Sequence, residues 1–299
     1  MSASISTGGA ELQSGKGHRD ENFPVASFVL APRHRAPVMA FYRFARFADD
    51  IADNPGARPG QKLVLLEAMR ATLAGEADKS PEALGLRRAL IGREALAVHG
   101  LDLLEAFRRD VTKTRYADWD ELMDYCRYSA APVGRFVLDV HGERRALWPA
   151  NDALCSALQV INHLQDCAKD YRELDRVYIP TGALAAVGAP VEALAAPRAS
   201  PELRAVIVGL ARRTAVLLDV SRPFAAGIRD VRLAYEVALI QRLAESLVAR
   251  LIRFDPLSER VHNRPVEIAG LALLALGDRL AGRGRAGAKR ARPAGEGAG

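Results

Sequence analysis

The sequence has few aromatic residues and no apolar run long enough to cross a membrane. Phe, Trp and Tyr make up 6% of its 299 residues, and the longest late apolar stretch, residues 266–276, contains Glu267. A membrane-spanning helix needs about 20 consecutive apolar residues. Residues 1–18 are polar and lack the apolar centre of a secretory signal. We therefore expect a cytoplasmic protein, with peripheral contact at the inner face of a membrane left open.

Cysteine pairs and the usual phosphate loops are also missing. The three cysteines, Cys126, Cys155 and Cys167, form no Cys-x-x-Cys pair, which predicts reduced thiols rather than a disulfide framework. There is no internal repeat and no Gly-rich loop of the P-loop or dinucleotide type. Glu-x-x-His occurs once, at residues 259–262 between two expected helices, whereas a di-iron centre in a helical bundle takes this motif from two helices, which argues against such a centre.

Positive charge is concentrated at the end of the chain. The formal net charge is +6, and the six basic residues and one glutamate that follow residue 278 supply +5 of it. Residues 282–299 are rich in Gly, Ala and Arg without apolar periodicity, which predicts a disordered basic tail. A flexible segment is likewise expected over residues 1–20. A solvated tail is favoured over one that binds RNA or a membrane, and no nucleic-acid partner is expected.

Apolar residues between residues 36 and 280 recur with helical periodicity, and no run of alternating strands is present. Helices are expected over residues 36–53, 60–75, 80–99, 102–112, 118–142, 151–173, 201–221, 225–254 and 264–281. Ser80, Asp118 and Ser200 are expected N-caps, with Glu121 completing a capping box. The prediction is one all-α domain over residues 21–281.

Three aspartates stand at the end of the first expected helix, where an Asn-Pro-Gly sequence stops it. Tyr42, Arg46, Asp49 and Asp53 follow at spacings of four, three and four, so they share one helix face, with Asp50 beside them. The partial negative charge at a helix C-terminus repels carboxylates. The cluster is therefore either a solvated helix end or a site prepared for cations.

A second polar stripe lies on the helix expected over residues 151–173. Gln159, Asn162, Asp166 and Asp170 are spaced by three, four and four, with apolar residues on the other faces. A surface ion-pair network is one interpretation. The other is that the two stripes face each other across a bundle as a four-carboxylate site. Oxygen-only ligation suits Mg²⁺, which shares its coordination with substrate phosphates, so a diphosphate is the expected ligand.

Four segments resemble, in order and spacing, the squalene/phytoene synthase family. DDIAD (residues 49–53) and QVINHLQDCAKD (159–170) resemble its two aspartate-rich motifs, and YCRYSAAPVG (125–134) and RVYIP (176–180) resemble two further segments. The resemblance covers residues 21–280. It implies an isoprenoid synthase fold, a helical bundle around a prenyl-binding cavity, with dependence on Mg²⁺.

Within the family, ENFPVAS (residues 21–27) resembles the opening of the hydroxysqualene synthase branch. This implies conversion of presqualene diphosphate to hydroxysqualene, with coupling to a presqualene diphosphate synthase and a hydroxysqualene reductase. The alternative is head-to-head condensation of two prenyl diphosphates to presqualene diphosphate, squalene or phytoene. A non-catalytic scaffold is a further alternative. One position departs from the family: Gln165 stands where Arg is frequent, which leaves one fewer cation near the diphosphate.

The resemblance also implies roles for individual residues. The expected Mg²⁺ ligands are Asp49, Asp50, Asp53, Asp166 and Asp170. The expected substrate-binding residues are Arg46, Gln159, Asn162, Phe23 and Arg176. The expected catalytic residues, whose aromatic faces stabilise carbocations, are Tyr128, Tyr42 and Tyr178. The simpler alternatives are a salt bridge from Arg46 to Asp50 and ordinary core packing of the tyrosines.

Overall fold

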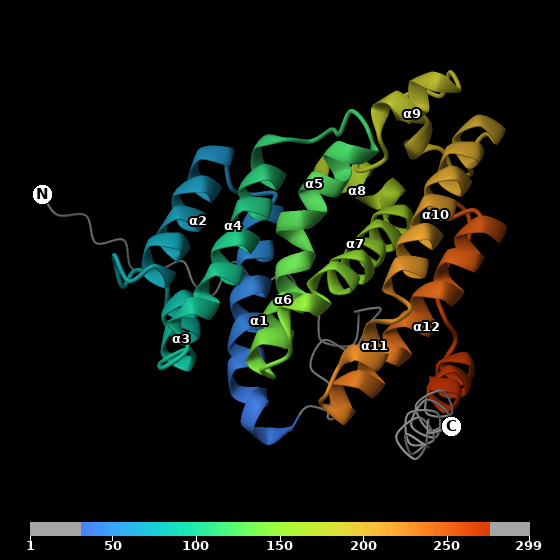
Figure 1. The fold of residues 1–299 in the computed structure, drawn as a ribbon. Helices are drawn as coiled ribbons and strands as arrows, with labels where there is room; N and C mark the ends of the chain where they lie inside the picture. Colours follow the sequence, from blue (N-terminus) through green and yellow to red (C-terminus); the bar gives the residue numbers. More distant parts are fainter. Residues whose placement is uncertain (1–30, 276–299) are drawn as a thin grey trace, which may run out of the picture.

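The structure is a computed structural model that describes residues 31–275. The expected flexible segment over residues 1–20, the tail over residues 282–299 and the residue Phe23 lie outside this range. Within it the chain forms helices and no strand, apart from one isolated bridge between Arg115 and Val177 (Figure 1). The predicted all-α fold class is confirmed.

Between Pro32 and Arg253 the chain forms twelve α-helices and three short 3₁₀ helices. They are α1 (Pro32–Asp53), α2 (Pro59–Leu73), α3 (Pro81–Ala89), η1 (Glu94–Leu96), α4 (Ala97–Thr112), α5 (Trp119–Ser129), α6 (Ala131–Val140), η2 (Arg145–Leu147), α7 (Trp148–Gln165), α8 (Cys167–Leu174), α9 (Thr181–Ala186), η3 (Val191–Ala195), α10 (Pro201–Ser221), α11 (Phe224–Gly227) and α12 (Val231–Arg253). Residues 265–275 are also helical.

The three expected N-caps are confirmed. The side chains of Ser80, Asp118 and Ser200 each accept a hydrogen bond from the backbone N–H three residues later, at 3.3, 2.9 and 3.2 Å. The second half of the capping box is not formed, because the Glu121 carboxylate accepts from the backbone N–H of Ala117 instead.

Four expected helices were predicted too long. The range 80–99 divides between α3 and α4, 118–142 between α5 and α6, 151–173 between α7 and α8, and 225–254 between α11 and α12. In the second case Pro132 explains the break, since proline is tolerated only in the first turn of a helix and here lies in the first turn of α6. In the third, α7 ends at Gln165 and Asp166 lies between the two helices.

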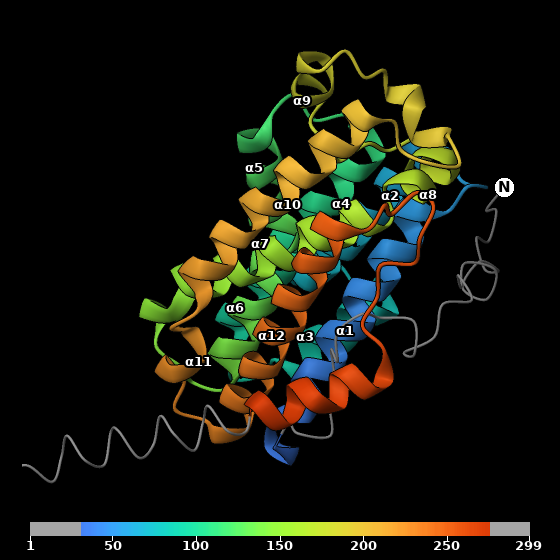
Figure 2. The same ribbon diagram turned by 90° about the vertical axis from the view of Figure 1, so that its right-hand side faces the viewer.

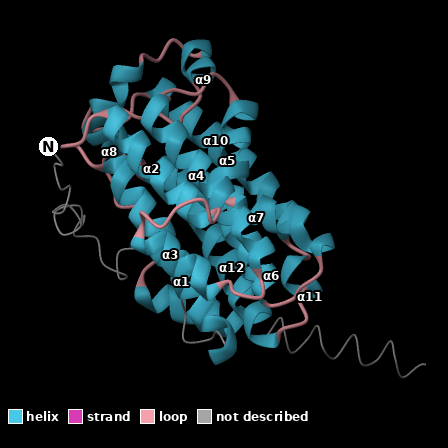
Figure 3. Ribbon diagram, turned by 90° about the vertical axis from the view of Figure 1, so that its left-hand side faces the viewer, coloured by secondary structure: helices cyan, strands magenta, loops and turns pink. Residues whose placement is uncertain are grey.

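Helix α7 lies at the centre of the bundle. It packs against α10, α12, α6 and α5, as Figure 2 shows from the side of α10 and α12. Helices α2, α3 and α4 pack against α1 (Figure 3). The buried apolar residues form two clusters, one around α7, α10 and α12 and the other around α1 and its neighbours. The ends of α1 and α7 that carry the aspartates therefore belong to different clusters, and they meet where the two clusters adjoin.

Candidate active site

A cavity of about 350 Å³ lies where the C-terminal ends of α1 and α7 meet. Asp49 and Asp53 line it from α1, and Asp166 and Asp170 line it from the α7–α8 junction. Its walls also include Tyr42, Arg46, Asp110, Tyr125, Gln159, Asn162, His163, Arg176 and Tyr178. The two polar stripes seen in the sequence thus face one cavity, which rules out two separate solvated surfaces.

Arg46 joins the aspartates of the first stripe. Its guanidinium lies 3.2 Å from Asp49 Oδ2 and donates to Asp50 Oδ1 at 2.8 Å. Asp50 is not among the residues that line the cavity. The carboxylate of Asp50 therefore holds Arg46 in place, as the simpler interpretation of the sequence anticipated, and Asp49 and Asp53 present the cavity-facing carboxylates.

The second stripe is shaped by the break between α7 and α8. The backbone N–H of Asp166 still bonds to Asn162 O at 2.9 Å, and the N–H of Asp170 bonds to Asp166 O at 2.8 Å. Asp166 follows the last residue of α7, and Asp170 lies in the first turn of α8, where the helix dipole favours a negative charge. The junction brings both carboxylates to one wall of the cavity.

Buried Arg176 connects the two halves of the molecule. Its guanidinium donates to the Asp53 carboxylate, to Ala52 O at 2.9 Å and to Asp110 O at 3.0 Å. Lys62 Nζ also donates to Ala52 O, at 2.8 Å, and burial together with the charge of Arg176 lowers the pKa of Lys62. The end of α1 is thus neutralised by two cations, which offsets the repulsion between its carboxylates and its dipole.

Asp110, which the sequence analysis did not select, organises the aromatic wall. It is only 7% exposed and accepts hydrogen bonds from the hydroxyls of Tyr125 and Tyr178, both at 2.9 Å. Burial raises the pKa of Asp110 to about 6. Burial and the charge of Asp110 raise the pKa of both tyrosines well above the usual value, so their hydroxyls remain protonated donors. Asp110 interrupts the apolar face of α4, which was the one sequence signal for it.

The expected catalytic tyrosines have different positions. Tyr42 and Tyr178 line the cavity, but Tyr128 does not. The Tyr128 ring instead lies 4.3 Å from the guanidinium carbon of Arg109. Tyr125, one helical turn earlier, takes the cavity-facing position. The structure therefore places Tyr125, and not Tyr128, on the wall of this cavity, and the catalytic role expected of Tyr128 stays a prediction.

The amide residues of the second stripe join a histidine. Gln159 Nε2 lies 3.1 Å from His163 Nε2, and the His163 ring stacks on Tyr178 with 3.5 Å between centroids. His163 Nδ1 is 3.8 Å from Asp170 Oδ2. Gln165 stands at the position that departs from the family. Its side-chain amide donates to the backbone carbonyl of Val261, 96 positions later in the sequence. Gln159, Asn162 and His163 line the cavity, and Gln165 does not.

A second, apolar cavity of about 210 Å³ adjoins the first. Tyr42, Ala45 and Val133 line both cavities. Beyond them its walls come from α1, α6, α7 and α12 and include the stacked rings of Phe41 and Phe136, 4.1 Å apart. An adjoining polar and apolar cavity suits a ligand with an anionic head and a long apolar tail.

The oxygen atoms of the four cavity-lining aspartates can hold divalent cations. A donor set made only of carboxylate oxygens suits Mg²⁺, whereas Zn²⁺ and iron favour sites that include imidazole. The neighbouring Arg46 supplies donors that a phosphate group accepts. These features define a helical-bundle enzyme that acts on an amphipathic diphosphate.

Residues 17–267 match the family model described as squalene/phytoene synthase, and the chain belongs to this family. It is 59% identical to a hydroxysqualene synthase from Zymomonas mobilis over 273 residues, covering 91% of this chain and 92% of that protein. It is 56% identical to one from Rhodopseudomonas palustris over 261 residues, covering 87% and 89%.

Solved structures show the same architecture. A squalene synthase HpnC from Alicyclobacillus acidocaldarius superposes with a TM-score of 0.68 at 33% identity, covering 79% of this chain and 90% of that one. A dehydrosqualene synthase superposes with a TM-score of 0.74 at 20% identity, covering 87% and 92%. The second likeness supports the isoprenoid synthase fold alone.

Proposed function

We propose that this enzyme converts presqualene diphosphate to hydroxysqualene with release of diphosphate, in a Mg²⁺-dependent reaction of squalene and hopanoid biosynthesis. The observation that carries the proposal is the identity above 50% to hydroxysqualene synthases over nearly the whole chain. The paired cavities agree with it. The polar cavity receives the diphosphate, and the apolar cavity receives prenyl chain.

The residues of the polar cavity bind and orient the diphosphate. Asp49 and Asp53 on one wall and Asp166 and Asp170 on the other are the residues that would hold Mg²⁺. Mg²⁺ held there would offset the charge that builds on the departing diphosphate. Arg46, held by its carboxylate partners, adds directed N–H donors on the same side.

The aromatic wall and the apolar cavity control the carbocation. Breaking the carbon–oxygen bond to diphosphate leaves a cyclopropylcarbinyl cation, which rearranges and then takes oxygen from one water molecule, releasing a proton. The faces of Tyr42 and Tyr178 stabilise positive charge nearby. Apolar walls exclude bulk water until rearrangement is complete. Gln159 and Asn162 are the cavity-lining amides that can orient the single water molecule.

Product analysis tests the function directly. Purified enzyme is incubated with Mg²⁺ and no reductant, in parallel with presqualene diphosphate and with farnesyl diphosphate, and products are identified by mass spectrometry. We expect hydroxysqualene from the first substrate and no consumption of the second. Consumption of farnesyl diphosphate would instead assign the chain to head-to-head condensation, the activity of other family members. Turnover of neither substrate would contradict both functions.

We also propose peripheral contact with a membrane surface, since the product is apolar. The helical segment over residues 265–275 exposes Val266 (75%) and Leu273 (72%), with Leu274 beside them, and the basic chain end follows it in sequence. Apolar side chains beside clustered cations favour anionic lipid. Among the described residues, no helix is long and apolar enough to span a bilayer.

Coupling to a presqualene diphosphate synthase and a hydroxysqualene reductase follows from the same proposal, because the substrate is amphipathic and the product is apolar.

Flotation with vesicles of anionic or neutral phospholipid, comparing wild type with Leu273→Glu, tests the membrane contact. Binding to anionic vesicles that the substitution weakens is the expected result. Equal flotation with both lipids would contradict it.

A further inference from the structure

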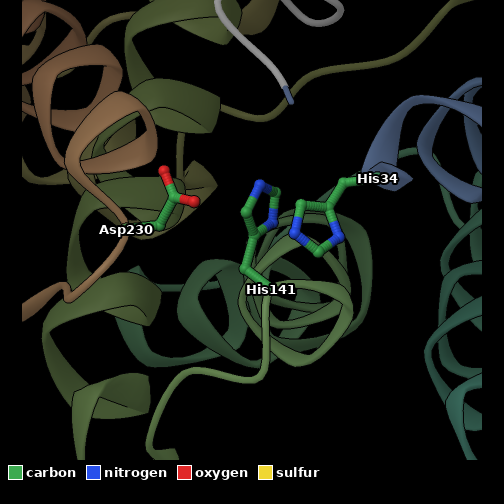
Figure 4. A group of neighbouring side chains, drawn as sticks. All are labelled: His34, His141 and Asp230. Atoms are coloured by element: carbon green, nitrogen blue, oxygen red, sulfur yellow. The ribbon is translucent and has the colours of Figure 1, made fainter. Parts of the chain in front are cut away.

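A second cluster of possible metal ligands lies at the opposite end of α1 from the aspartates. His34, His141 and Asp230 each offer one ligand atom, and these atoms all lie within 4.8 Å of one another (Figure 4). His34 and Asp53 are 19 positions apart on one helix, which is about 28 Å at 1.5 Å per residue. The cluster is therefore separate from the diphosphate site.

The three residues occupy the ends of three helices that wall the apolar cavity. His34 is in the first turn of α1, His141 follows the last residue of α6, and Asp230 is the N-cap of α12. Within about one turn of them, Val38, Val137 and Leu233 line the apolar cavity. The cluster thus lies just beyond one end of that cavity, where three segments distant in sequence converge.

The hydrogen bonds of the cluster leave ligand atoms directed inward. His141 Nδ1 lies 2.7 Å from Val137 O, and an N–H donated there leaves the Nε2 lone pair available. Metal-binding histidines usually donate their other ring N–H to such a carbonyl. Asp230 Oδ1 accepts the backbone N–H groups of Arg232 and Leu233, so Oδ2 faces the cluster.

His34 is 5% exposed, and its imidazole is held in the neutral form that metals require. Burial, the neighbouring His141 and Arg33 together lower its pKa. Its Nε2 accepts a hydrogen bond from Arg33 Nε at 2.9 Å, so the Nε2 lone pair points toward Arg33. Arg33 also lies 3.9 Å from Asp230 Oδ2, and its side chain is 74% exposed. A cation on a flexible, exposed side chain already occupies the position.

We propose that His34, His141 and Asp230 form a binding site for a divalent cation of the zinc class, with Arg33 as the cation that it displaces. Two imidazoles and one carboxylate suit Zn²⁺ or Co²⁺, whereas Mg²⁺ prefers oxygen ligands alone. Ligand atoms around tetrahedral Zn²⁺ lie about 3.3 Å apart, so side-chain movements of at most about 1.5 Å would bring these atoms, now within 4.8 Å of one another, to that spacing. Arg33 leaves at little cost, because an exposed ion pair contributes little.

A metal at this position joins the ends of α1, α6 and α12. It binds the folded protein only, so the stabilisation grows with the logarithm of the metal concentration once that exceeds Kd. Because the three helices wall the apolar cavity, it also holds one end of that cavity closed.

Cobalt titration tests the site. Full-length protein freed of metal by chelation is supplied with saturating Mg²⁺, which keeps the aspartates occupied, and is titrated with Co²⁺. The expected result is one equivalent of Co²⁺ with the visible absorption bands of tetrahedral nitrogen and oxygen coordination, displaced by Zn²⁺, and a rise in the melting temperature. His141→Ala and Asp230→Asn, which keeps the N-cap oxygen, should each lose the bands.

Two further variants make the test selective. Arg33→Ala removes the competing cation and should tighten Co²⁺ binding about tenfold, whereas a simple Arg–His–carboxylate cluster would gain no affinity. His262→Ala removes a half-buried histidine elsewhere and should leave the bands unchanged. Absence of the bands in wild type and in Arg33→Ala, or bands that persist in His141→Ala, would overturn the proposal.

Discussion

The polar and apolar cavities share Tyr42, Ala45 and Val133, yet they are built in different ways. The polar cavity is held by directed bonds, in which Arg176 and Asp110 fix the groups around them. The apolar cavity is held mainly by packing of side chains, and Asn151 and Cys155 are hydrogen-bonded exceptions in its wall. Substitutions in the first should therefore change catalysis more than folding, and substitutions in the second should do the reverse.

Removing a carboxylate from the polar cavity should have the largest effect. Asp166→Asn keeps the shape of the side chain but removes a charge that would hold Mg²⁺, and we expect turnover of presqualene diphosphate to fall by about 10³-fold, or about 4 kcal/mol. The free energy of unfolding should not decrease, because four like charges repel one another across the cavity. Steady-state kinetics and urea unfolding measure the two quantities. A loss of stability that parallels the loss of activity would contradict the expectation that substitutions in the polar cavity change catalysis more than folding.

The two tyrosines of α5 provide a matched pair. Tyr125→Phe removes a hydroxyl that Asp110 holds at the cavity wall, and we expect turnover to fall by about 10–100-fold. Tyr128→Phe changes a ring that lies against Arg109 outside the cavity, and turnover should change less than about twofold. Both variants retain the aromatic ring, so the packing of the ring is unchanged in each. A larger effect at Tyr128 would support the catalytic role that the sequence predicted for it.

The apolar cavity is better tested through stability. At Gly134 on α6, an added Cβ would meet Asn151 Oδ1 at 2.0 Å and Cys155 Sγ at 2.7 Å. Gly134→Ala should therefore lower the free energy of unfolding by about 1–3 kcal/mol. The control is Gly209→Ala on α10, where nothing lies within 4 Å of the added atom. Helix propensity alone should stabilise that variant by about 1 kcal/mol. If urea unfolding gave changes in the free energy of unfolding of the same sign for both variants, the packing argument would be refuted.

The smallest expected effect is a pH dependence at Asp110. Because burial raises its pKa to about 6, the folded protein holds a proton there between about pH 4 and that value, while the unfolded chain does not. The stability that this proton provides is present at low pH and is lost as the pH rises through about 6. Measured against Asp110→Asn, the free energy of unfolding of wild type should fall over this interval and be flat above pH 7. A difference in the free energy of unfolding that stays constant over the whole pH range would show that the pKa of Asp110 is not raised.

Much of the polar cavity could be predicted from local sequence. The spacing of Asp49 and Asp53, and of Asp166 and Asp170, depends only on helical periodicity, and these residues do line one cavity. Helix breaks were less predictable, because four merged helices have continuous apolar periodicity across their junctions. Pro132 marked one of those junctions, and Gly92 and Gly227 stand at two others.

The sequence by itself determined the helical fold class, the N-caps and the two aspartate stripes, because each depends on residues within about one turn of one another. Tertiary structure alone decided which tyrosine of α5 reaches the cavity, since Tyr125 and Tyr128 are one turn apart. It also decided that Arg176 bonds to Asp53, 123 positions away, and that His34 meets His141 and Asp230. Such contacts depend on how distant helices cross, which no local pattern specifies.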